Sequence, residues 1–461
     1  MRETREESKS KRNYLQTNMG STSTKTFKFQ SYNTSFFTKN WLPWTLSVLL
    51  PIAIIHFYLY PLPSFLSDHL QVNTNSISTP SPSPSPSPPS SSSSQESSSD
   101  ETSCDYGNGK WVREKIGPLY NGTSCDTIKD NQNCMTHGRP DMGYLYWRWK
   151  PKKCKVPRFE PETFLQFVRN KHLGFVGDSV ARNQLESLLC MLSTFSSPVL
   201  VYTNGEDNKF RKWNFPSYNF TLSIYWSPFL VKGIEKKSDI EPDNYNTLYL
   251  ESVDEKWAGE MGHLDMVVLS IGHWFLHPAV YFYGDSALGC HYCKGQNYTE
   301  IGFYDVYRKA IKTTLDAIIE RKGPIGKEMD VIVTTFSPAH FEGEWDKFGA
   351  CPKTKPYKPE EKKLEGMDEE MRKVELEEIK IAKEKAKKFG NLRLEVVDIT
   401  KLSLLRPDGH PGPYLYPFPF ANGISDRVQN DCVHWCLPGP IDTWNEIMLD
   451  IMKRREGNKS Q

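Results

Sequence analysis

Short apolar runs alternate with helical stretches from about residue 156 to the C-terminus, and this alternation constrains the fold more than any other feature. The runs are nearly continuous in hydrophobic residues, which suits strands buried on both faces of a sheet. They lie at 172–177, 198–202, 264–270, 330–335 and 392–397. Alternating strands and helices predict an α/β fold with an open, mainly parallel sheet and flanking helices. In such sheets the active site lies beyond the carboxyl ends of the strands.

Three segments between these runs are predicted to be helices. The first follows Ser179 and places Leu185, Leu188, Leu189 and Leu192 on a helical period. The second spans 304–321. The third, 358–388, is dense in Glu and Lys and predicts a solvated amphipathic helix.

The N-terminal region predicts a membrane anchor. Segment 41–62 is apolar and its first twenty residues carry no Lys, Arg, Asp or Glu, which is enough to span a bilayer. Residues 1–40 hold eight Lys/Arg against three Glu, so this tail is expected on the cytoplasmic side. A cleaved signal peptide is the alternative, but the basic region and the apolar stretch are both longer than such peptides usually have.

Beyond the anchor, residues 63–103 are rich in Ser and Pro and predict a disordered, hydrated stem. Residues 104–155 form a Cys-rich subdomain, and residues 156–461 form the α/β domain. Anchor, stem and folded head are the layout of a single-pass type II enzyme of the Golgi or endoplasmic reticulum. The formal net charge of +1 argues against a nucleic-acid-binding protein.

All ten cysteines follow the anchor, and an even number on the lumenal side predicts disulfides. The spacings Cys290-x-x-Cys293 and Cys432-x-x-x-Cys436 leave zinc as an alternative, which the oxidising compartment disfavours. Four sequons are candidate N-glycosylation sites: Asn121, Asn219, Asn297 and Asn458.

Gly177-Asp178-Ser179 directly follows the first predicted strand and opens the first predicted helix. A serine at such a turn lies at the carboxyl edge of the sheet, beside helix N–H groups that can bind a developing oxyanion. Gly177 permits the tight turn. The alternative is an ordinary helix cap by Asp178 or Ser179.

Two further motifs supply the remaining parts of a nucleophilic site. Asp431 and His434 are three residues apart, so the carboxylate can orient the imidazole as a base for a serine. Gly272-His273-Trp274 follows the third predicted strand, where a glycine lets backbone N–H groups approach a reacting oxygen. Taken singly, the Asp431 and His434 motif is also explained by a surface pair. The Gly272-His273-Trp274 motif is also explained by a loop with a packed tryptophan.

The order of these three motifs resembles the SGNH (GDSL-type) esterase superfamily. The fuller set is closer still to the plant trichome birefringence-like family of polysaccharide O-acetyltransferases, over roughly residues 104–455. The motifs that carry the resemblance are Cys104-Asp105 with Gly109-Lys-Trp-Val112, Gly138-Arg-Pro-Asp141, Tyr146-Trp-Arg-Trp-Lys-Pro151, Gly177-Asp-Ser-Val-Ala-Arg-Asn-Gln184, Gly272-His-Trp274 and Asp431-Cys-Val-His-Trp-Cys436. Two positions depart from the family pattern: Ser270-Ile271 replaces Asn-Thr, and His137 replaces Asn.

The resemblance implies a role for each matching residue. Ser179 would be the nucleophile that takes the acetyl group, His434 the general base, and Asp431 the residue that orients it. The Ser179 N–H and the region of Gly177, Asp178, Gly272 and His273 would form or support the oxyanion hole, and Arg182 and Asn183 would position substrate or support the site. The disulfides implied are Cys104–Cys154, Cys125–Cys190, Cys134–Cys436 and Cys351–Cys432, with Cys290–Cys293 as a local pair.

The resemblance also implies acetyl transfer to a cell-wall hemicellulose, with xyloglucan favoured and xylan or mannan as alternatives. The acceptor would be the polysaccharide and the donor acetyl-CoA or a derivative of it; no bound cofactor or metal is expected. A hydrolase with the same triad and a polysaccharide-binding protein are alternative functions. A metal-dependent glycosyltransferase is disfavoured because the chain contains no Asp-x-Asp.

Overall fold

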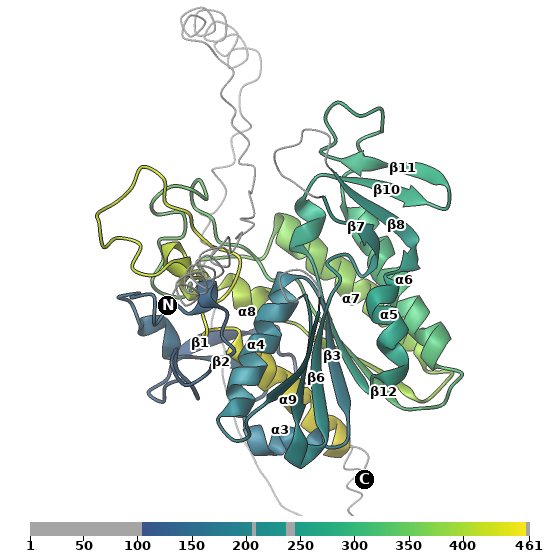
Figure 1. The fold of residues 1–461 in the computed structure, drawn as a ribbon, viewed down its shortest axis with the longest axis horizontal. Coiled ribbons are helices and arrows are strands. Elements are labelled where there is room, and N and C mark those ends of the chain that lie inside the picture. Colours follow the sequence, from purple (N-terminus) through teal and green to yellow (C-terminus); the bar gives the residue numbers. More distant parts are fainter. Residues whose placement is uncertain (1–103, 205–208, 237–244, 458–461) are drawn as a thin grey trace, which may run out of the picture. The chain divides into compact units, whose positions relative to one another are not determined.

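A seven-stranded sheet forms the centre of the computed structural model, which describes residues 104–204, 209–236 and 245–457 (Figure 1). The strand order is β13-β12-β9-β3-β6-β5-β4. The first five strands in this order are parallel, and β5 and β4 extend the sheet with antiparallel pairing. In chain order the strands are β3 (His172–Gly177), β4 (Val199–Asn204), β5 (Phe210–Phe215), β6 (Phe220–Trp226), β9 (Met266–Ser270), β12 (Met329–Thr334) and β13 (Leu392–Val397).

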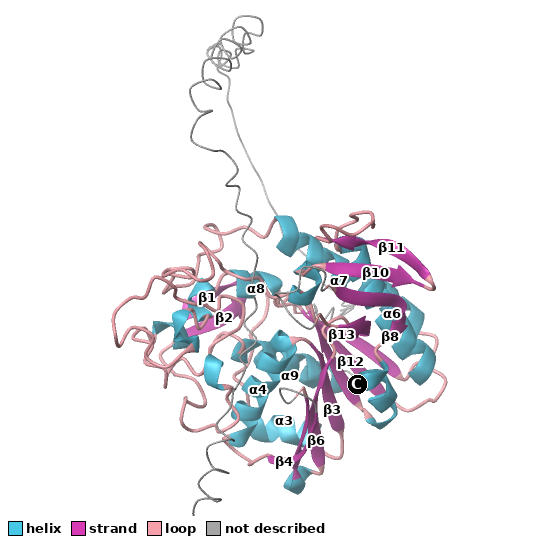
Figure 2. Ribbon diagram, turned by 45° about the horizontal axis from the view of Figure 1, so that its top comes forward, coloured by secondary structure: helices cyan, strands magenta, loops and turns pink. Residues whose placement is uncertain are grey.

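Helices cover both faces of this sheet (Figure 2). The first face carries α3 (Pro161–Phe167), α4 (Ser179–Ser193) and α9 (Asp442–Gly457). The second carries α5 (Glu255–Ala258), α6 (Tyr304–Lys322) and α7 (Gly366–Ala386). The short helix α8 (Thr400–Leu404) follows β13.

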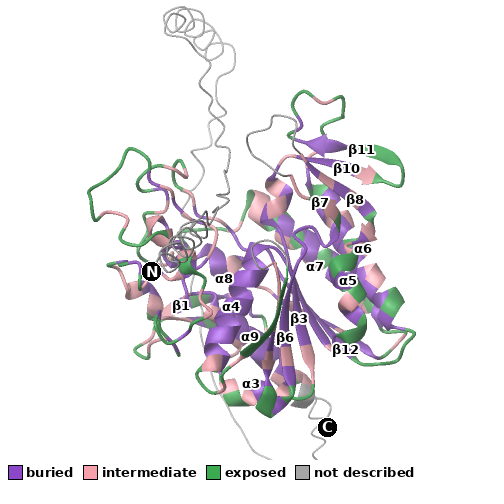
Figure 3. Ribbon diagram, viewed as in Figure 1, coloured by how far each residue is buried: buried purple, intermediate pink, exposed green. Residues whose placement is uncertain are grey.

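Side chains of the central strands alternate between the two helical layers, as the period of a strand requires. Phe175 of β3 packs in the core with α4 and α9, and its neighbour Val176 packs in the core with α6 and α7. Both are fully buried, and burying each such side chain stabilises the fold by roughly 1.5–3 kcal/mol. Figure 3 shows the central strands β3, β6 and β12 buried along most of their length.

The prediction of an α/β fold with a largely parallel sheet is confirmed. Four of the five predicted strands correspond to β3, β9, β12 and β13, and the predicted helices correspond to α4, α6 and α7. The run at 198–202 was predicted as a strand buried on both faces, and this is wrong. It forms β4, the antiparallel edge strand of the sheet, and all of its residues are exposed. Among the residues that the structure describes, no further strand pairs with its outer side.

Two smaller sheets were not predicted. Strands β7 (Val231–Ile234), β8 (Asn246–Val253), β10 (Ala279–Tyr283) and β11 (Ser286–His291) form a four-stranded sheet in the order β11-β10-β8-β7. Strands β1 (Gly109–Arg113) and β2 (Trp147–Pro151) form an antiparallel ribbon in the Cys-rich region. Trp111 and Trp149 of this ribbon lie with ring centroids 5.5 Å apart and are buried in the core with α4 and α9.

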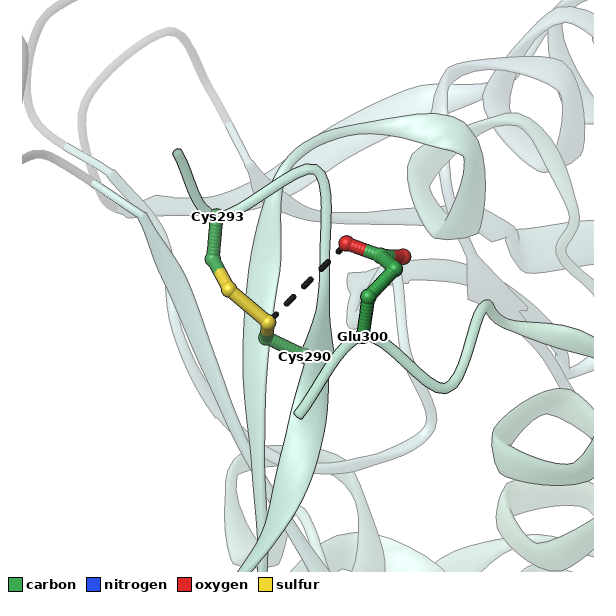
Figure 4. Close-up of side chains that lie close together, drawn as sticks. All are labelled: Cys290, Cys293 and Glu300. Carbon is green, nitrogen blue, oxygen red and sulfur yellow. Dashed lines mark hydrogen bonds between the residues drawn. A yellow bond between two sulfur atoms is a disulfide. The ribbon is translucent and has the colours of Figure 1, made fainter. Parts of the chain in front are cut away.

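The structure contains the five disulfides that the resemblance implies: Cys104–Cys154, Cys125–Cys190, Cys134–Cys436, Cys290–Cys293 and Cys351–Cys432. Within the described ranges, Cys290, Cys293 and Glu300 alone bring three potential metal-ligating atoms together (Figure 4). Both sulfurs belong to one disulfide, and zinc binds the thiolate form of cysteine. The zinc alternative therefore has no ligand set here.

The predicted tail, anchor and stem at 1–40, 41–62 and 63–103 lie outside the described residues. In the part of the chain that is described, no helix combines the length and the apolar character needed to cross a membrane. Three of the four sequon asparagines, Asn121, Asn219 and Asn297, are exposed, and Asn458 lies outside the described residues.

Candidate active site

Gly177 ends strand β3 at a point where two strands approach closely. A Cβ atom on this residue would lie 1.8 Å from the carbonyl oxygen of Ser270, at the end of the neighbouring strand β9. The Asp178 N–H donates to the same carbonyl over 3.3 Å. Only glycine fits this contact, so the turn that follows β3 is fixed against β9.

Asp178 and Ser179 begin helix α4 at this turn. Asp178 is the N-cap, and its Oδ1 accepts from the Val180 N–H at 2.9 Å. Burial raises the pKa of Asp178 to about 6, while the N–H groups of Val180, Ala181 and Gly272 and the nearby His434 oppose that rise. The alternative reading of this motif as a cap is thus correct for Asp178, but it leaves Ser179 free for another role.

Ser179 is the first residue of α4, and 5% of it is exposed. The first N–H groups of a helix have no partner inside the helix, and they carry the positive end of its dipole. The Ser179 N–H is one of these groups, so it is a candidate donor to an oxyanion that develops on a substrate.

Asp431 and His434 form a hydrogen-bonded pair in the loop that precedes α9. Asp431 Oδ2 lies 2.7 Å from His434 Nδ1, and Asp431 Oδ1 accepts from the backbone N–H groups of Val433 at 3.0 Å and His434 at 2.9 Å. This bonding fixes both the loop and the imidazole. It orients Nε2, the other ring nitrogen, as the one that exchanges protons.

The carboxyl of Asp431 is strongly acidic. Burial by itself would raise its pKa, but the adjacent His434 charge and the three hydrogen bonds outweigh burial and hold the pKa well below its usual range. Asp431 is therefore ionised at any pH near neutrality. An ionised partner stabilises the imidazolium that forms when His434 takes a proton.

Asn183 joins the serine helix to the histidine loop. It lies one turn after Ser179 and is fully buried. Its Oδ1 accepts from the Trp435 N–H at 2.7 Å, and its Nδ2 donates to the Trp435 carbonyl at 3.2 Å and to Gln132 Oε1 at 3.0 Å. Asn183 thus holds the residue after His434 against the helix that begins with Ser179.

His434 lies close enough to Asp178, the neighbour of Ser179, to affect its pKa, and Asn183 joins the two segments, so Ser179 and the Asp431–His434 pair lie in one region. Ser179 Oγ and His434 Nε2 are not hydrogen-bonded to each other. Such contacts are often long in free enzymes and shorten when substrate binds. A serine hydroxyl, an imidazole, a carboxylate that orients the imidazole and a helix N–H are the groups that attack on an ester or thioester requires. The arrangement is therefore a candidate site for that chemistry.

Gly272 brings a second backbone segment to the same site. A Cβ atom on it would lie 2.3 Å from the ring of Phe336, so only glycine fits here. His273 follows, and its Nε2 lies 2.8 Å from the Ser337 carbonyl. Burial lowers the pKa of His273 to about 4, so its ring is neutral and supports the loop rather than binding an anion.

Arg182 lies one turn along α4 from Ser179 and lines a cavity of about 370 Å³. The cavity lies between residues 126–129 of the Cys-rich region and strands β4 and β5. The Arg182 guanidinium lies 5.4 Å from the ring centroid of Trp226. This cavity is a candidate place for part of a substrate.

Glu375 is a site-supporting residue that the sequence reasoning missed. Its Oε1 lies 2.6 Å from Tyr307 Oη, its Oε2 accepts from the Phe336 N–H at 2.8 Å, and Tyr307 Oη lies 3.2 Å from the Ile271 carbonyl. Burial raises the pKa of Glu375 to about 8. Tyr307 Oη donates to Glu375 and lies beside the Ile271 carbonyl, while the Phe336 N–H donates to Glu375, so this network braces both segments around Gly272.

The two departures from the family pattern have different surroundings. His137 is buried, with Nδ1 2.8 Å from the Tyr414 carbonyl and Nε2 3.2 Å from Asp130, so it ties the Cys-rich region to the loop after α8. At Ser270-Ile271, the second departure, the contacts are made by backbone carbonyls. The Ser270 carbonyl accepts from the Asp178 N–H and the Ile271 carbonyl lies beside Tyr307 Oη, so both carbonyls connect this segment to the site.

The fold and the site define an α/β protein of the serine acyl-esterase and acyltransferase class, in which the serine begins a helix at the carboxyl edge of the sheet. Residues 156–451 match the GDSL/SGNH-like acyl-esterase family found in Pmr5 and Cas1p, and residues 102–155 match the PMR5 N-terminal domain. The chain belongs to this family.

Curated relatives of the chain carry two kinds of name. A protein named xyloglucan O-acetyltransferase 1 of Populus trichocarpa is 64% identical over 418 residues, which cover 90% of this chain and 94% of that protein. The Arabidopsis thaliana protein of the same name is 59% identical, covering 77% of this chain and 82% of its own length. Protein trichome birefringence-like 25 of Arabidopsis thaliana is 44% identical, with 79% and 80% covered.

Proposed function

We propose that this chain is an enzyme that transfers acetyl groups to hydroxyl groups of xyloglucan, with Ser179 as the nucleophile. The observation that carries the proposal is the Asp431–His434 pair, held by Asn183 against the helix that begins with Ser179. The names of the relatives at 59–64% identity supply the acceptor.

The first half of the reaction forms an acetyl-enzyme. Ser179 Oγ attacks the acetyl carbonyl carbon of the donor while His434 Nε2 takes the hydroxyl proton. The oxyanion develops beside the Ser179 N–H at the start of α4. As the tetrahedral intermediate collapses, the bond between the acetyl group and the donor breaks, and His434 gives its proton to the leaving group.

The second half transfers the acetyl group to the sugar. A hydroxyl of the polysaccharide gives its proton to His434 Nε2 and attacks the acetyl-serine carbonyl. The bond between Ser179 Oγ and the acetyl carbon breaks, and the proton on His434 returns to Ser179. Throughout, Asp431 remains ionised and stabilises the imidazolium.

We also propose a location for this chemistry. The basic tail at 1–40 and the apolar segment at 41–62 support a type II anchor in the Golgi membrane, with the disulfide-bonded head in the lumen. The exposed sequons Asn121, Asn219 and Asn297 fit a lumenal head. Glycosidase treatment and protease protection of the chain in microsomes test this topology: an unglycosylated, protease-sensitive head contradicts it.

The experiment for the function uses the full chain purified from a eukaryotic secretory host. The protein is incubated with a small acetyl ester and a panel of deacetylated xyloglucan, xylan, mannan and pectin oligosaccharides, and products are read by mass spectrometry. We expect acetylated xyloglucan oligosaccharides from the parent protein and none from Ser179→Ala.

Each other outcome has a definite meaning. Free acetate as the only product identifies an esterase with the same triad. Acetylation of a different polysaccharide keeps the enzyme class and corrects the acceptor. Binding of oligosaccharide without turnover identifies a binding protein, and full activity of Ser179→Ala removes the assigned nucleophile.

A further inference from the structure

Two loops bonded to the segment of the Asp431–His434 pair carry aromatic side chains to the surface. The first loop, 337–353, lies between β12 and α7, and the second, 410–430, leads directly to Asp431. The two loops lie side by side (Figure 1), and the Val428 N–H donates to the Asp346 carbonyl at 2.9 Å. We define the aromatic surface by five of their residues: Phe348, Tyr414, Tyr416, Phe418 and Phe420.

Three residues of the aromatic surface reach far into solvent. Phe348 is 60% exposed, Phe418 62% and Tyr416 37%. The rings of Phe348 and Phe420 lie with centroids 5.5 Å apart, and those of Phe420 and Tyr414 lie 6.1 Å apart. Rings from both loops therefore contribute to one surface. Large apolar side chains that gather in this way on the outside of a protein mark a binding surface.

Phe418 has a backbone conformation that a bulky residue rarely adopts. Its φ angle is +46°, in the left-handed region. The Phe418 N–H donates to the His137 carbonyl at 3.0 Å, and its ring lies where a Cβ atom on Gly138 would be, 2.6 Å away. Contacts with the Cys-rich region thus hold Phe418 in a strained conformation while most of the residue stays exposed. Such strain is found where a side chain has a function at a binding site.

Both loops are attached to the catalytic pair. Gly412 exchanges two backbone hydrogen bonds with Asp431, at 2.9 and 3.0 Å, and Cys351 forms a disulfide with the residue that follows Asp431. Tyr414 comes two residues after Gly412, and Phe348 comes three residues before Cys351. At 3.3–3.6 Å for each residue, the chain places them at most roughly 7 and 11 Å from these two attachment points. The aromatic surface therefore begins close to the pair.

The charges of the two loops nearly cancel. Residues 337–353 and 410–430 carry four Asp/Glu and three Lys/Arg. Arg427 lies 3.2 Å from Asp346, and Lys353 lies 3.5 Å from Glu342. An acidic polymer such as pectin, or an anionic membrane, would instead call for an excess of basic residues. The surroundings of the aromatic surface therefore fit a ligand without charge.

Exposed rings in neutral surroundings fit a neutral polysaccharide. The faces of a sugar ring carry C–H groups, which pack against an aromatic ring, while the hydroxyl groups at its edge stay hydrated. When one hydroxyl of a long chain reacts at Ser179, the neighbouring sugar residues lie over the protein beside the site. The loops attached to Asp431 provide such a surface.

We propose that the aromatic surface binds the sugar residues of the acceptor that neighbour the one being acetylated. The proposal rests on the proposed function and deepens it, since it names where the acceptor chain lies. Phe348 and Phe418, one from each loop, are the most exposed of the five residues and make the main contacts. Because they contact the acceptor and not the donor, they set the KM for the acceptor and leave formation of the acetyl-serine unchanged.

The test measures kcat and acceptor KM of the full chain with a deacetylated xyloglucan oligosaccharide. Phe348→Ala and Phe418→Ala remove exposed rings, so both variants should fold. Each should raise the acceptor KM roughly threefold to tenfold, the loss expected for one stacked ring. The kcat and the rate of acetyl-serine formation from an acetyl ester should stay close to those of the parent. Phe348→Tyr keeps the ring and should keep the parent KM.

The matched control is Phe195→Ala. Phe195 is also an exposed phenylalanine, at 50%, but it lies beyond the C-terminal end of α4, whereas Ser179 begins that helix. This variant should keep the parent KM. A parent-like acceptor KM in both Phe348→Ala and Phe418→Ala overturns the proposal. So does a fall in kcat and in acetyl-serine formation at unchanged KM, because that is the result if the loops only support Asp431.

Binding without catalysis separates this proposal from the proposed function. Isothermal titration calorimetry compares Ser179→Ala with Ser179→Ala/Phe348→Ala, using the same oligosaccharide. We expect weaker binding by the second protein. Equal binding overturns the proposal, and co-sedimentation with phosphatidylcholine vesicles that Phe348→Ala abolishes would then assign the surface to a membrane. Weaker binding by the second protein, when the parent transfers no acetyl group, leaves the aromatic surface intact and overturns only the function.

Discussion

Replacing Asn183 by alanine tests whether the link between the serine helix and the histidine loop supports catalysis. Asn183 is fully buried and makes three hydrogen bonds, two of them to Trp435. At about 1 kcal/mol for each hydrogen bond, with an added cost for the buried Trp435 groups left unpaired, the free energy of unfolding should fall by roughly 3–5 kcal/mol.

The matched control is Asn445→Ala. Asn445 on α9 is also fully buried and makes three comparable hydrogen bonds, two to Gln184 and one to Ser187. It does not contact the Asp431–His434 loop, so its loss should lower stability by a similar amount and leave the site in place.

The assay pairs urea unfolding, followed by tryptophan fluorescence with the disulfides intact, with kcat measured on the folded fraction. A displacement of about 1 Å in a catalytic group can cost about a hundredfold in rate. We therefore expect Asn183→Ala to lose about a hundredfold in kcat and Asn445→Ala to keep a kcat near that of the parent. Equal kcat values in two equally destabilised variants would refute the reasoning.

Three further changes have definite expected outcomes. Folding raises the pKa of Glu375 to about 8, so the folded state keeps a proton that the unfolded state loses. The free energy of unfolding should therefore fall as the pH rises from about 4.5 to 8. Glu375→Gln should flatten that slope in urea titrations at several pH values. Gly177→Ala, whose Cβ would lie 1.8 Å from the Ser270 carbonyl, should yield little folded protein on gel filtration. Asp431→Asn should fold yet lose roughly 10⁴-fold in kcat in steady-state assays, because the amide neither orients the imidazole correctly nor stabilises the imidazolium. A loss below tenfold would contradict its role.

The central part of the fold could be predicted because its strands are buried on both faces. The runs that became β3, β9, β12 and β13 are nearly continuous in apolar residues, and burial between two helical layers requires that composition. Strand β6 was missed because Phe220–Trp226 alternates polar and apolar residues until its end. Run 198–202 does form a strand, but it was wrongly predicted to be buried on both faces. Its apolar residues are exposed at an edge of the sheet, and composition does not reveal that position.

The candidate site could be predicted only where local sequence carries it. Gly177, Asp178 and Ser179 are adjacent in the chain, and Asp431 lies three residues from His434, so short motifs identify them. Glu375 lies in a helix dense in Glu and Lys, which was predicted to be solvated as a whole, yet this side chain is 1% exposed. His410, whose Nδ1 lies 2.6 Å from the His434 carbonyl oxygen, and His340, which contacts His410, are seventy residues apart and belong to no motif. Tertiary packing alone brings such residues to the site.

The most direct test of the central claim is to trap the acetyl group on the enzyme. The full chain is mixed with an acetyl ester in the absence of acceptor, quenched in acid, digested and mapped by mass spectrometry. The account predicts one acetylated peptide, modified at Ser179, that loses its acetyl group when deacetylated xyloglucan oligosaccharide is added before the quench. Acetylated xyloglucan formed without any acetyl group on Ser179 would contradict the account.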